Sequence, residues 1–145
     1  AMEEDVFTNG PTALPEPGTR DQFVLKEFII NLEALPELWD SSSTDHKNFI
    51  KRSEALSKLL TVYKQVKKDA SLDDIRKKIN SLRSNYRKEF KKIVESKRSG
   101  TGGDVYRPKS WVFHQLHFLN KTEQPIFPVS VYHIFILLFY LYTCL

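Results

Sequence analysis

Apolar residues in the middle of the chain recur every three or four positions, which is the period of an amphipathic helix rather than of a strand. The first such run contains Val24, Phe28 and Leu32, so the pattern predicts a helix that starts near Phe23. This helix should end before Pro36, because the residue preceding a proline is driven out of helical geometry. Trp39 then follows as an apolar anchor just beyond the helix end.

Two longer helices are predicted next. The second runs over about 48–68, with an inward stripe of Phe49, Leu56, Leu59, Leu60, Tyr63 and Val66. The third runs over about 72–97, with Ser71 as its N-cap. Its apolar stripe keeps a period near 3.6 through Ile75, Ile79, Leu82, Tyr86, Phe90 and Ile93.

A glycine-rich segment, SGTGGD (99–104), ends the third helix, and SWVFHQLHFLN (110–120) predicts a short fourth one. Residues 23–120 contain no alternating strand pattern. The predicted fold class is therefore all-α, a three-helix bundle of the helix-turn-helix kind with a short fourth helix. The core residues that we single out are Phe28, Leu32, Trp39, Leu56, Ile79, Leu82, Tyr86 and Trp111.

The two ends of the chain differ from this domain in composition. Residues 1–22 are acidic, hold three prolines and lack helical period, so they predict a flexible leader. Residues 121–145 form an apolar tail, and 126–145 contain no Asp, Glu, Lys or Arg. As a helix, that stretch would be about 30 Å long, enough to cross a bilayer. The favoured interpretation is an alternative or mispredicted C-terminus. The two other interpretations are a membrane anchor and a segment that packs onto the bundle.

The net charge of +4 is unevenly distributed along the chain. Residues 1–22 hold five acids and one base, whereas 23–121 hold 21 Lys and Arg against 12 Asp and Glu. Residues 72–98, the predicted third helix and the arginine after it, carry ten basic and four acidic residues. A basic domain of this kind favours an anionic partner.

On a helical wheel, the side of the third helix opposite its apolar stripe collects basic and small polar residues. We expect this side to carry no acid, so that like charges stack, Arg87 with Lys91 and Lys88 with Lys92. An anionic ligand would relieve that repulsion. Arginine, lysine, serine and asparagine are also the residues that contact phosphates and base edges from a helix in the major groove. The alternative interpretation is a helix surface that only faces water.

The predicted DNA-binding residues are Lys77, Asn80, Ser81, Arg83, Ser84, Arg87, Lys88, Lys91 and Lys92. Lys91 and Lys92 are expected nearer the phosphates than the others. Arg83 lies closest to the apolar stripe, so bracing of the fold is its alternative role.

Four segments occur in an order that is typical of one known family: LPELWD, the spacer SSSTDHKN, IRKKINSLRSNYRKEFKKI and VYRPKSWVFHQLHFLN. Together they resemble the MADF domain, a Myb/SANT-like module found chiefly in insect transcription regulators. The resemblance covers 23 to about 120. It implies a Myb-like bundle whose last long helix contacts double-stranded DNA, and hence a nuclear transcription regulator.

The resemblance also implies roles for individual residues. Trp39, Leu82, Tyr86 and Trp111 match structural positions of the family, and Arg83 and Arg87 match recurrent basic ones. The family usually has tryptophan where this chain has Leu56 and Ile79. The BESS motif of related regulators is not visible, so self-association stays open. Because SANT-like relatives also bind histone tails, a chromatin or regulator-binding adaptor that uses the acidic segment 26–45 is the alternative function.

Other chemistry finds little support in the sequence. The single cysteine, Cys144, excludes an internal disulfide framework and a cysteine-based zinc site. His114 and His117 lie three positions apart, but no further metal ligand accompanies them. The segment 99–104 lacks the Gly-Lys-Ser/Thr ending of a phosphate-binding loop. We therefore predict no enzyme activity, no metal site and no cofactor.

Overall fold

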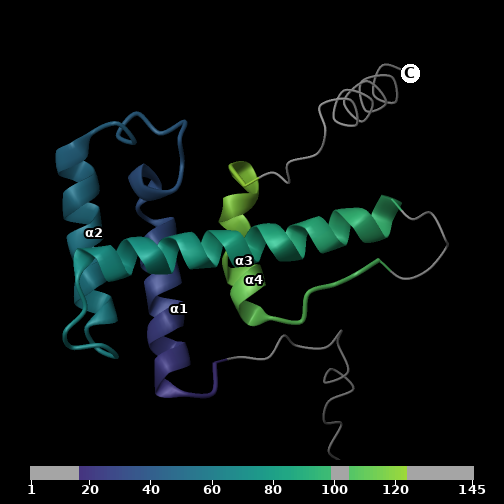
Figure 1. Ribbon diagram of the computed structural model, residues 1–145, viewed down its shortest axis with the longest axis horizontal. Helices are drawn as coiled ribbons and strands as arrows, with labels where there is room; N and C mark the ends of the chain where they lie inside the picture. The colour runs from purple at the N-terminus through teal and green to yellow at the C-terminus, as the bar shows by residue number, and fades with distance from the viewer. Residues whose placement is uncertain (1–16, 99–104, 124–145) are drawn as a thin grey trace, which may run out of the picture.

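The computed structural model describes residues 17–98 and 105–123, and these residues form helices and no strand (Figure 1). The predicted all-α class is confirmed. In chain order the elements are α1 (Arg20–Glu33), the 3₁₀ helix η1 (Pro36–Leu38), α2 (Phe49–Tyr63), α3 (Leu72–Arg98), α4 (Trp111–Gln115) and the 3₁₀ helix η2 (His117–Lys121).

The first helix starts three residues earlier than predicted because of a capping box. The Thr19 hydroxyl accepts a hydrogen bond from the backbone N–H of Gln22, and the Gln22 side chain accepts one from the backbone N–H of Thr19. Such a pair satisfies two amide donors that have no partner inside the helix. The polar segment before Phe23 therefore begins α1.

The second helix is shorter than predicted and buries fewer of its apolar residues. It starts after Asn48, whose side chain accepts from the backbone N–H of Lys51, and it ends at Tyr63. Phe49 is 77% exposed and Val66 is 36% exposed, so the prediction that both face inward is wrong. The helical wheel gives the direction of a side chain, but no element in the described part of the chain covers Phe49 or Val66.

The third helix has nearly the bounds that its periodicity predicts. At its start the Ser71 hydroxyl accepts from the backbone N–H of Asp74, and the Asp74 carboxylate accepts from the backbone N–H of Ser71. Its 27 residues make a rod of about 40 Å. In Figure 1 this rod extends past α4, and core residues of α3 pack against α2 and α4.

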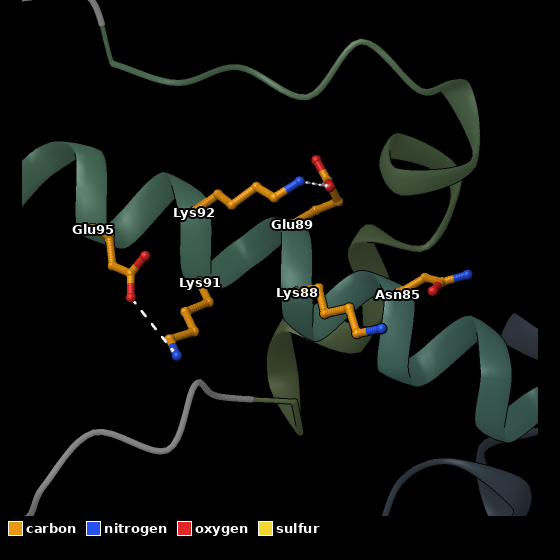
Figure 2. Close-up of a pocket in the computed structure, with 6 residues that line it drawn as sticks. All are labelled: Asn85, Lys88, Glu89, Lys91, Lys92 and Glu95. Atoms are coloured by element: carbon orange, nitrogen blue, oxygen red, sulfur yellow. Dashed lines mark hydrogen bonds and ion pairs between the residues drawn. The ribbon is translucent and has the colours of Figure 1, made fainter.

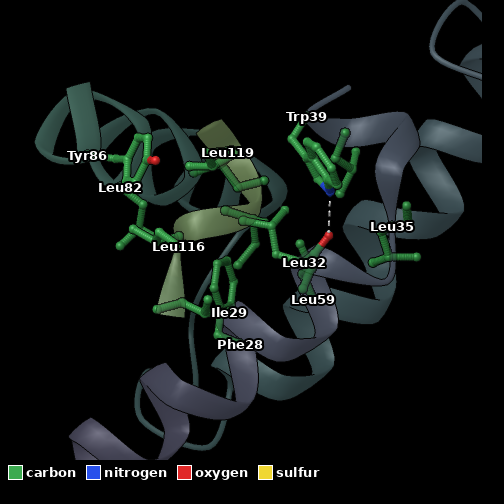
Figure 3. Packing of buried hydrophobic residues seen from close by; sticks show 14 of the residues in the cluster. Phe28, Ile29, Leu32, Leu35, Trp39, Leu59, Leu82, Tyr86, Leu116 and Leu119 are labelled. Carbon is green, nitrogen blue, oxygen red and sulfur yellow. Dashed lines mark hydrogen bonds between the residues drawn. The ribbon is translucent and has the colours of Figure 1, made fainter. Parts of the chain in front are cut away.

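One hydrophobic core joins α1, α2, α3, α4 and η2 (Figure 3). Of the residues predicted for it, Phe28, Leu32, Trp39, Leu56, Ile79, Leu82 and Tyr86 are buried. Trp111 is only half-buried at the edge of this core, because it is the first residue of α4. Phe113 instead packs on α3, where its ring stacks on that of Tyr86 with centroids 4.8 Å apart.

Two carboxylates in the described part of the chain, those of Asp40 and Glu123, are buried. Asp40 follows η1 and accepts hydrogen bonds from the Ser42 hydroxyl at 2.6 Å and the Ser42 backbone N–H at 2.9 Å. Lys121 pairs with its other oxygen at 3.1 Å. The Ser42 hydrogen bonds, helped by Lys121, lower the pKa of Asp40. This network fastens the end of the described chain onto η1.

No helix among the described residues is long and apolar enough to cross a membrane. The apolar stretch 126–145, to which the anchor interpretation applies, lies outside the described residues, as does 1–16 of the predicted leader.

Candidate nucleic-acid interface

The surface of α3 opposite the core carries most of the residues that sequence predicts for DNA binding. Ile75, Ile79, Leu82 and Tyr86 bury one side of the helix. On other sides, the exposed predicted residues are Lys77, Asn80, Ser81, Arg87, Lys88, Lys91 and Lys92, whereas Arg83 and Ser84 are half-buried. We call the seven exposed residues the outer face of α3.

The outer face is not free of acidic partners, so that prediction is wrong. Lys77 pairs with Asp73 at 2.8 Å, and Lys91 pairs with Glu95 at 3.7 Å, each across one turn of helix. All four side chains are more than half exposed. The stacking of like charges is therefore partly relieved within α3 itself. Because water competes for such exposed pairs, they stabilise the fold little.

Lys92 lies against the segment that begins at Val105. Its ammonium group pairs with Glu89 at 2.7 Å and lies 5.7 Å from the centre of the Tyr106 ring. The Tyr106 hydroxyl donates to Glu89 at 2.7 Å, and the Tyr106 backbone N–H donates to the Ser96 hydroxyl at 2.9 Å. The Lys92 and Tyr106 hydrogen bonds lower the pKa of Glu89. Lys92 thus helps to attach residues 105 and 106 to α3.

A shallow hollow of about 360 Å³ lies along the C-terminal half of α3 (Figure 2). Its lining residues are Asn85, Lys88, Glu89, Lys91, Lys92 and Glu95. In Figure 2 Lys91 and Lys92 are joined to acids by dashed lines, whereas Lys88 is not. Among the described residues, no ion pair involves Lys88, so its charge is available to an external anion.

Arg83 and Arg87 both bind Glu123, forty and thirty-six positions further along the chain. The Nε atom of Arg83 pairs with Glu123 Oε1, and the Nε atom of Arg87 lies 3.2 Å from Glu123 Oε2. The Glu123 side chain is 5% exposed, against 30% for Arg83 and 45% for Arg87. The alternative role of Arg83, bracing of the fold, agrees with this contact.

Sequence reasoning misses Glu123 because the residue falls in the segment assigned to the apolar tail. No periodicity connects it to α3, since its contact spans some forty residues. Tyr106 is also missed, because no periodicity connects its segment to α3 and its contact with Glu89 spans 17 positions. Arg76, by contrast, is exposed on α3 itself and has no ion pair within the described part of the chain. Its position on the wheel, close to that of Arg87, is the signal that could have found it.

His114, one of the two histidines considered as metal ligands, contacts the backbone. The Nε2 atom of His114 lies 2.9 Å from the carbonyl oxygen of Pro108, which makes it a link between α4 and the segment before it. In 17–98 and 105–123, no group of three or more His, Cys, Asp or Glu residues is arranged to hold a metal ion.

Comparison with known proteins adds one match. Residues 28–119 match the family model of the MADF DNA-binding domain, described as "Alcohol dehydrogenase transcription factor Myb/SANT-like". The match runs from the middle of α1 into η2 and spans more than half of the chain. No curated protein and no solved structure matches the chain.

Proposed function

Because the chain belongs to the Myb/SANT-like MADF family of DNA-binding domains, we propose that it is a transcription regulator whose α3 docks in the major groove of duplex DNA. The observation that carries this proposal is the outer face of α3, a row of exposed basic and small polar side chains opposite the buried stripe. The major groove is about 12 Å wide and admits one helix with its side chains.

The contacts within α3 support a division of roles on the outer face. Asn80 on the outer face and the half-buried Ser84, one turn further along α3, are polar and uncharged, which suits hydrogen bonds to base edges. Lys88 carries an unpaired charge that suits a phosphate. Lys77 and Lys91 are held only by exposed carboxylates, so a phosphate can replace those carboxylates at little cost to the fold.

The acidic segment of α1 and η1 offers less to a basic partner such as a histone tail. Asp40 is buried and binds Ser42 and Lys121. Asp45 pairs with Lys51 at 2.7 Å, and Glu27 accepts from the Gln65 side chain at 3.2 Å. Because three of the five acids of 26–45 already have partners, the adaptor function has less support than DNA binding.

Selection of binding sites from random duplex DNA by the purified chain tests the proposal. We expect an enriched sequence whose affinity exceeds that of a scrambled duplex of the same composition. A pull-down with basic histone peptides, run with the same protein, tests the adaptor function. If the chain binds the peptides and has no affinity for any duplex, the adaptor function replaces DNA binding as the proposed function. A nuclear location is expected for a DNA-binding regulator and is checked by imaging the tagged chain in cells.

A further inference from the structure

Glu123 connects the end of the described chain to the DNA-binding helix of the proposed function. Its two carboxylate oxygens are divided between two arginines, Oε1 for Arg83 and Oε2 for Arg87. The main chain at Glu123 is held in place, because its backbone N–H donates to the carbonyl oxygen of Leu119 at 2.8 Å. A buried acceptor on a fixed backbone thus holds two consecutive turns of α3.

The Nε atom of Arg83 donates a hydrogen bond to Glu123, and the Nε atom of Arg87 approaches the same carboxylate as an ion pair. A guanidinium group has five N–H donors, four of them on the two terminal nitrogens. Among the described residues, the Arg87 guanidinium group makes this one ion pair and no hydrogen bond, and the side chain is 45% exposed. The Nε contact therefore limits the rotation of the side chain while its planar pair of terminal donors stays accessible.

The charges around Glu123 do not balance. Two guanidinium groups share one carboxylate, which leaves one positive charge without compensation. Arg83 and Arg87 also lie one turn apart on α3, where like charges repel. A second acceptor group, on the edge of a base or on a phosphate, would compensate this remaining positive charge.

We propose that Glu123 is a positioning residue for DNA recognition, and that it orients Arg87 so that its terminal nitrogens bind two acceptors on a base edge, the O6 and N7 atoms of guanine. This inference rests on the proposed docking of α3 in the major groove. An arginine that is already ordered loses less conformational freedom on binding than a free one. Orientation also restricts which base it can bind, so Glu123 contributes to sequence discrimination rather than to general attraction.

The effect of neutralising Glu123 separates positioning from simple electrostatics. If Glu123 acted only through its charge, Glu123→Gln would strengthen binding to every duplex, because a negative charge near the phosphates is removed. If it positions Arg87, the same change lowers the ratio of affinities for the selected and scrambled duplexes.

The experiment measures both affinities by fluorescence anisotropy for wild type and variants. We expect Glu123→Gln to reduce the affinity ratio about tenfold, which is typical for loss of one bidentate base contact. Asp40→Asn is the matched control, since it also neutralises a buried carboxylate but one that forms no hydrogen bond or ion pair with α3; it should leave the ratio within about twofold. In an Arg87→Ala background, Glu123→Gln should have no further effect on the ratio.

Two results would overturn the inference. An unchanged ratio in Glu123→Gln, including an equal loss for both duplexes as expected of a phosphate contact, removes the positioning role and leaves the proposed function standing. A wild-type chain that binds no duplex overturns the proposed function, and the positioning role with it.

A second measurement does not depend on the folding of any variant. Hydrogen exchange of arginine Nε–H groups is followed by NMR in the wild-type chain. The Arg87 group should exchange more slowly than that of Arg76, which is exposed on the same helix without an ion pair in the described regions. Equal exchange rates would contradict the fixed orientation of Arg87.

Discussion

The indole Nε1–H of Trp39 donates a hydrogen bond to the carbonyl oxygen of Leu32 at 3.0 Å, inside the core (Figure 3). Leu32 lies in the last turn of α1, where carbonyl groups run out of partners within the helix. The Trp39 ring also packs on Phe118 of η2, with centroids 4.9 Å apart. One side chain of the LPELWD segment thus fastens the end of α1 to the C-terminal elements.

Trp39→Phe is therefore expected to destabilise the domain. The variant loses a buried hydrogen bond and part of a large buried ring, so the free energy of unfolding should fall by about 2 kcal/mol. Urea denaturation followed by circular dichroism measures the change. Trp111→Phe is the control, since Trp111 is only half-buried, and its effect should be clearly smaller. Equal losses would contradict the assignment of Trp39 as the main anchor.

Asp40 should make the fold sensitive to acid. Its pKa lies below the ordinary value of 3.8 because the Ser42 side chain and backbone, and then Lys121, favour the charged form. A group whose pKa is lower in the folded chain stabilises the fold above its unfolded pKa, and this contribution is lost as the pH falls towards the lowered value.

Thermal unfolding between pH 2.5 and pH 6 tests this acid sensitivity. The difference in melting temperature between wild type and Asp40→Asn should be largest above about pH 4 and should shrink below it. Asp69→Asn, at an exposed position, serves as the control and should follow the wild-type curve. A difference that stays constant down to pH 2.5 would show that the Asp40 charge does not contribute.

Lys88 should contribute to DNA affinity without contributing to base preference. A lysine that contacts one phosphate releases about one counterion on binding, so Lys88→Ala should lower the slope of log K against log salt by about one unit. Its effect should be the same for selected and scrambled duplexes. Lys58→Ala, at an exposed position of α2, should leave the slope unchanged. Identical slopes for wild type and Lys88→Ala would place Lys88 away from the phosphates.

Glu95 should weaken DNA binding by holding Lys91. Glu95→Gln removes a negative charge from the outer face and releases the lysine, so affinity should rise about threefold at low salt. The gain should diminish as salt is added, because salt screens both charges. Glu54→Gln, an exposed acid on α2, is the matched control for the change in net charge. Equal or weaker binding by Glu95→Gln would mean that Lys91 does not approach DNA.

Local sequence signals predicted much of the fold. The long apolar period gave the bounds of α3 to within one residue, and Trp39 was expected in the core from its position after the helix-ending Pro36. The start of α1 was also within reach, because Thr19 and Gln22 have the spacing of a capping box.

Features that depend on distant residues were not predictable in this way. A helical wheel indicates the side on which Phe49 lies, but not whether another element reaches it, and in the structure it is exposed. The contact of Glu123 with α3 depends on how η2 packs, which no local pattern encodes. The acids Asp73 and Glu95, by contrast, could have been predicted as partners of Lys77 and Lys91, because their positions on the helical wheel follow from the sequence alone.

Charge reversal on the outer face of α3 tests the central claim most directly. The affinity of the purified chain for its selected duplex is compared with those of Lys88→Glu/Lys91→Glu and of the control Lys58→Glu/Lys64→Glu, which changes the net charge equally on and after α2. All three proteins should retain the helical circular dichroism of the wild type. We predict a loss of about 100-fold for the α3 pair and a loss of less than about fivefold for the control pair. Equal losses for the two pairs would show that α3 is not the surface that binds DNA.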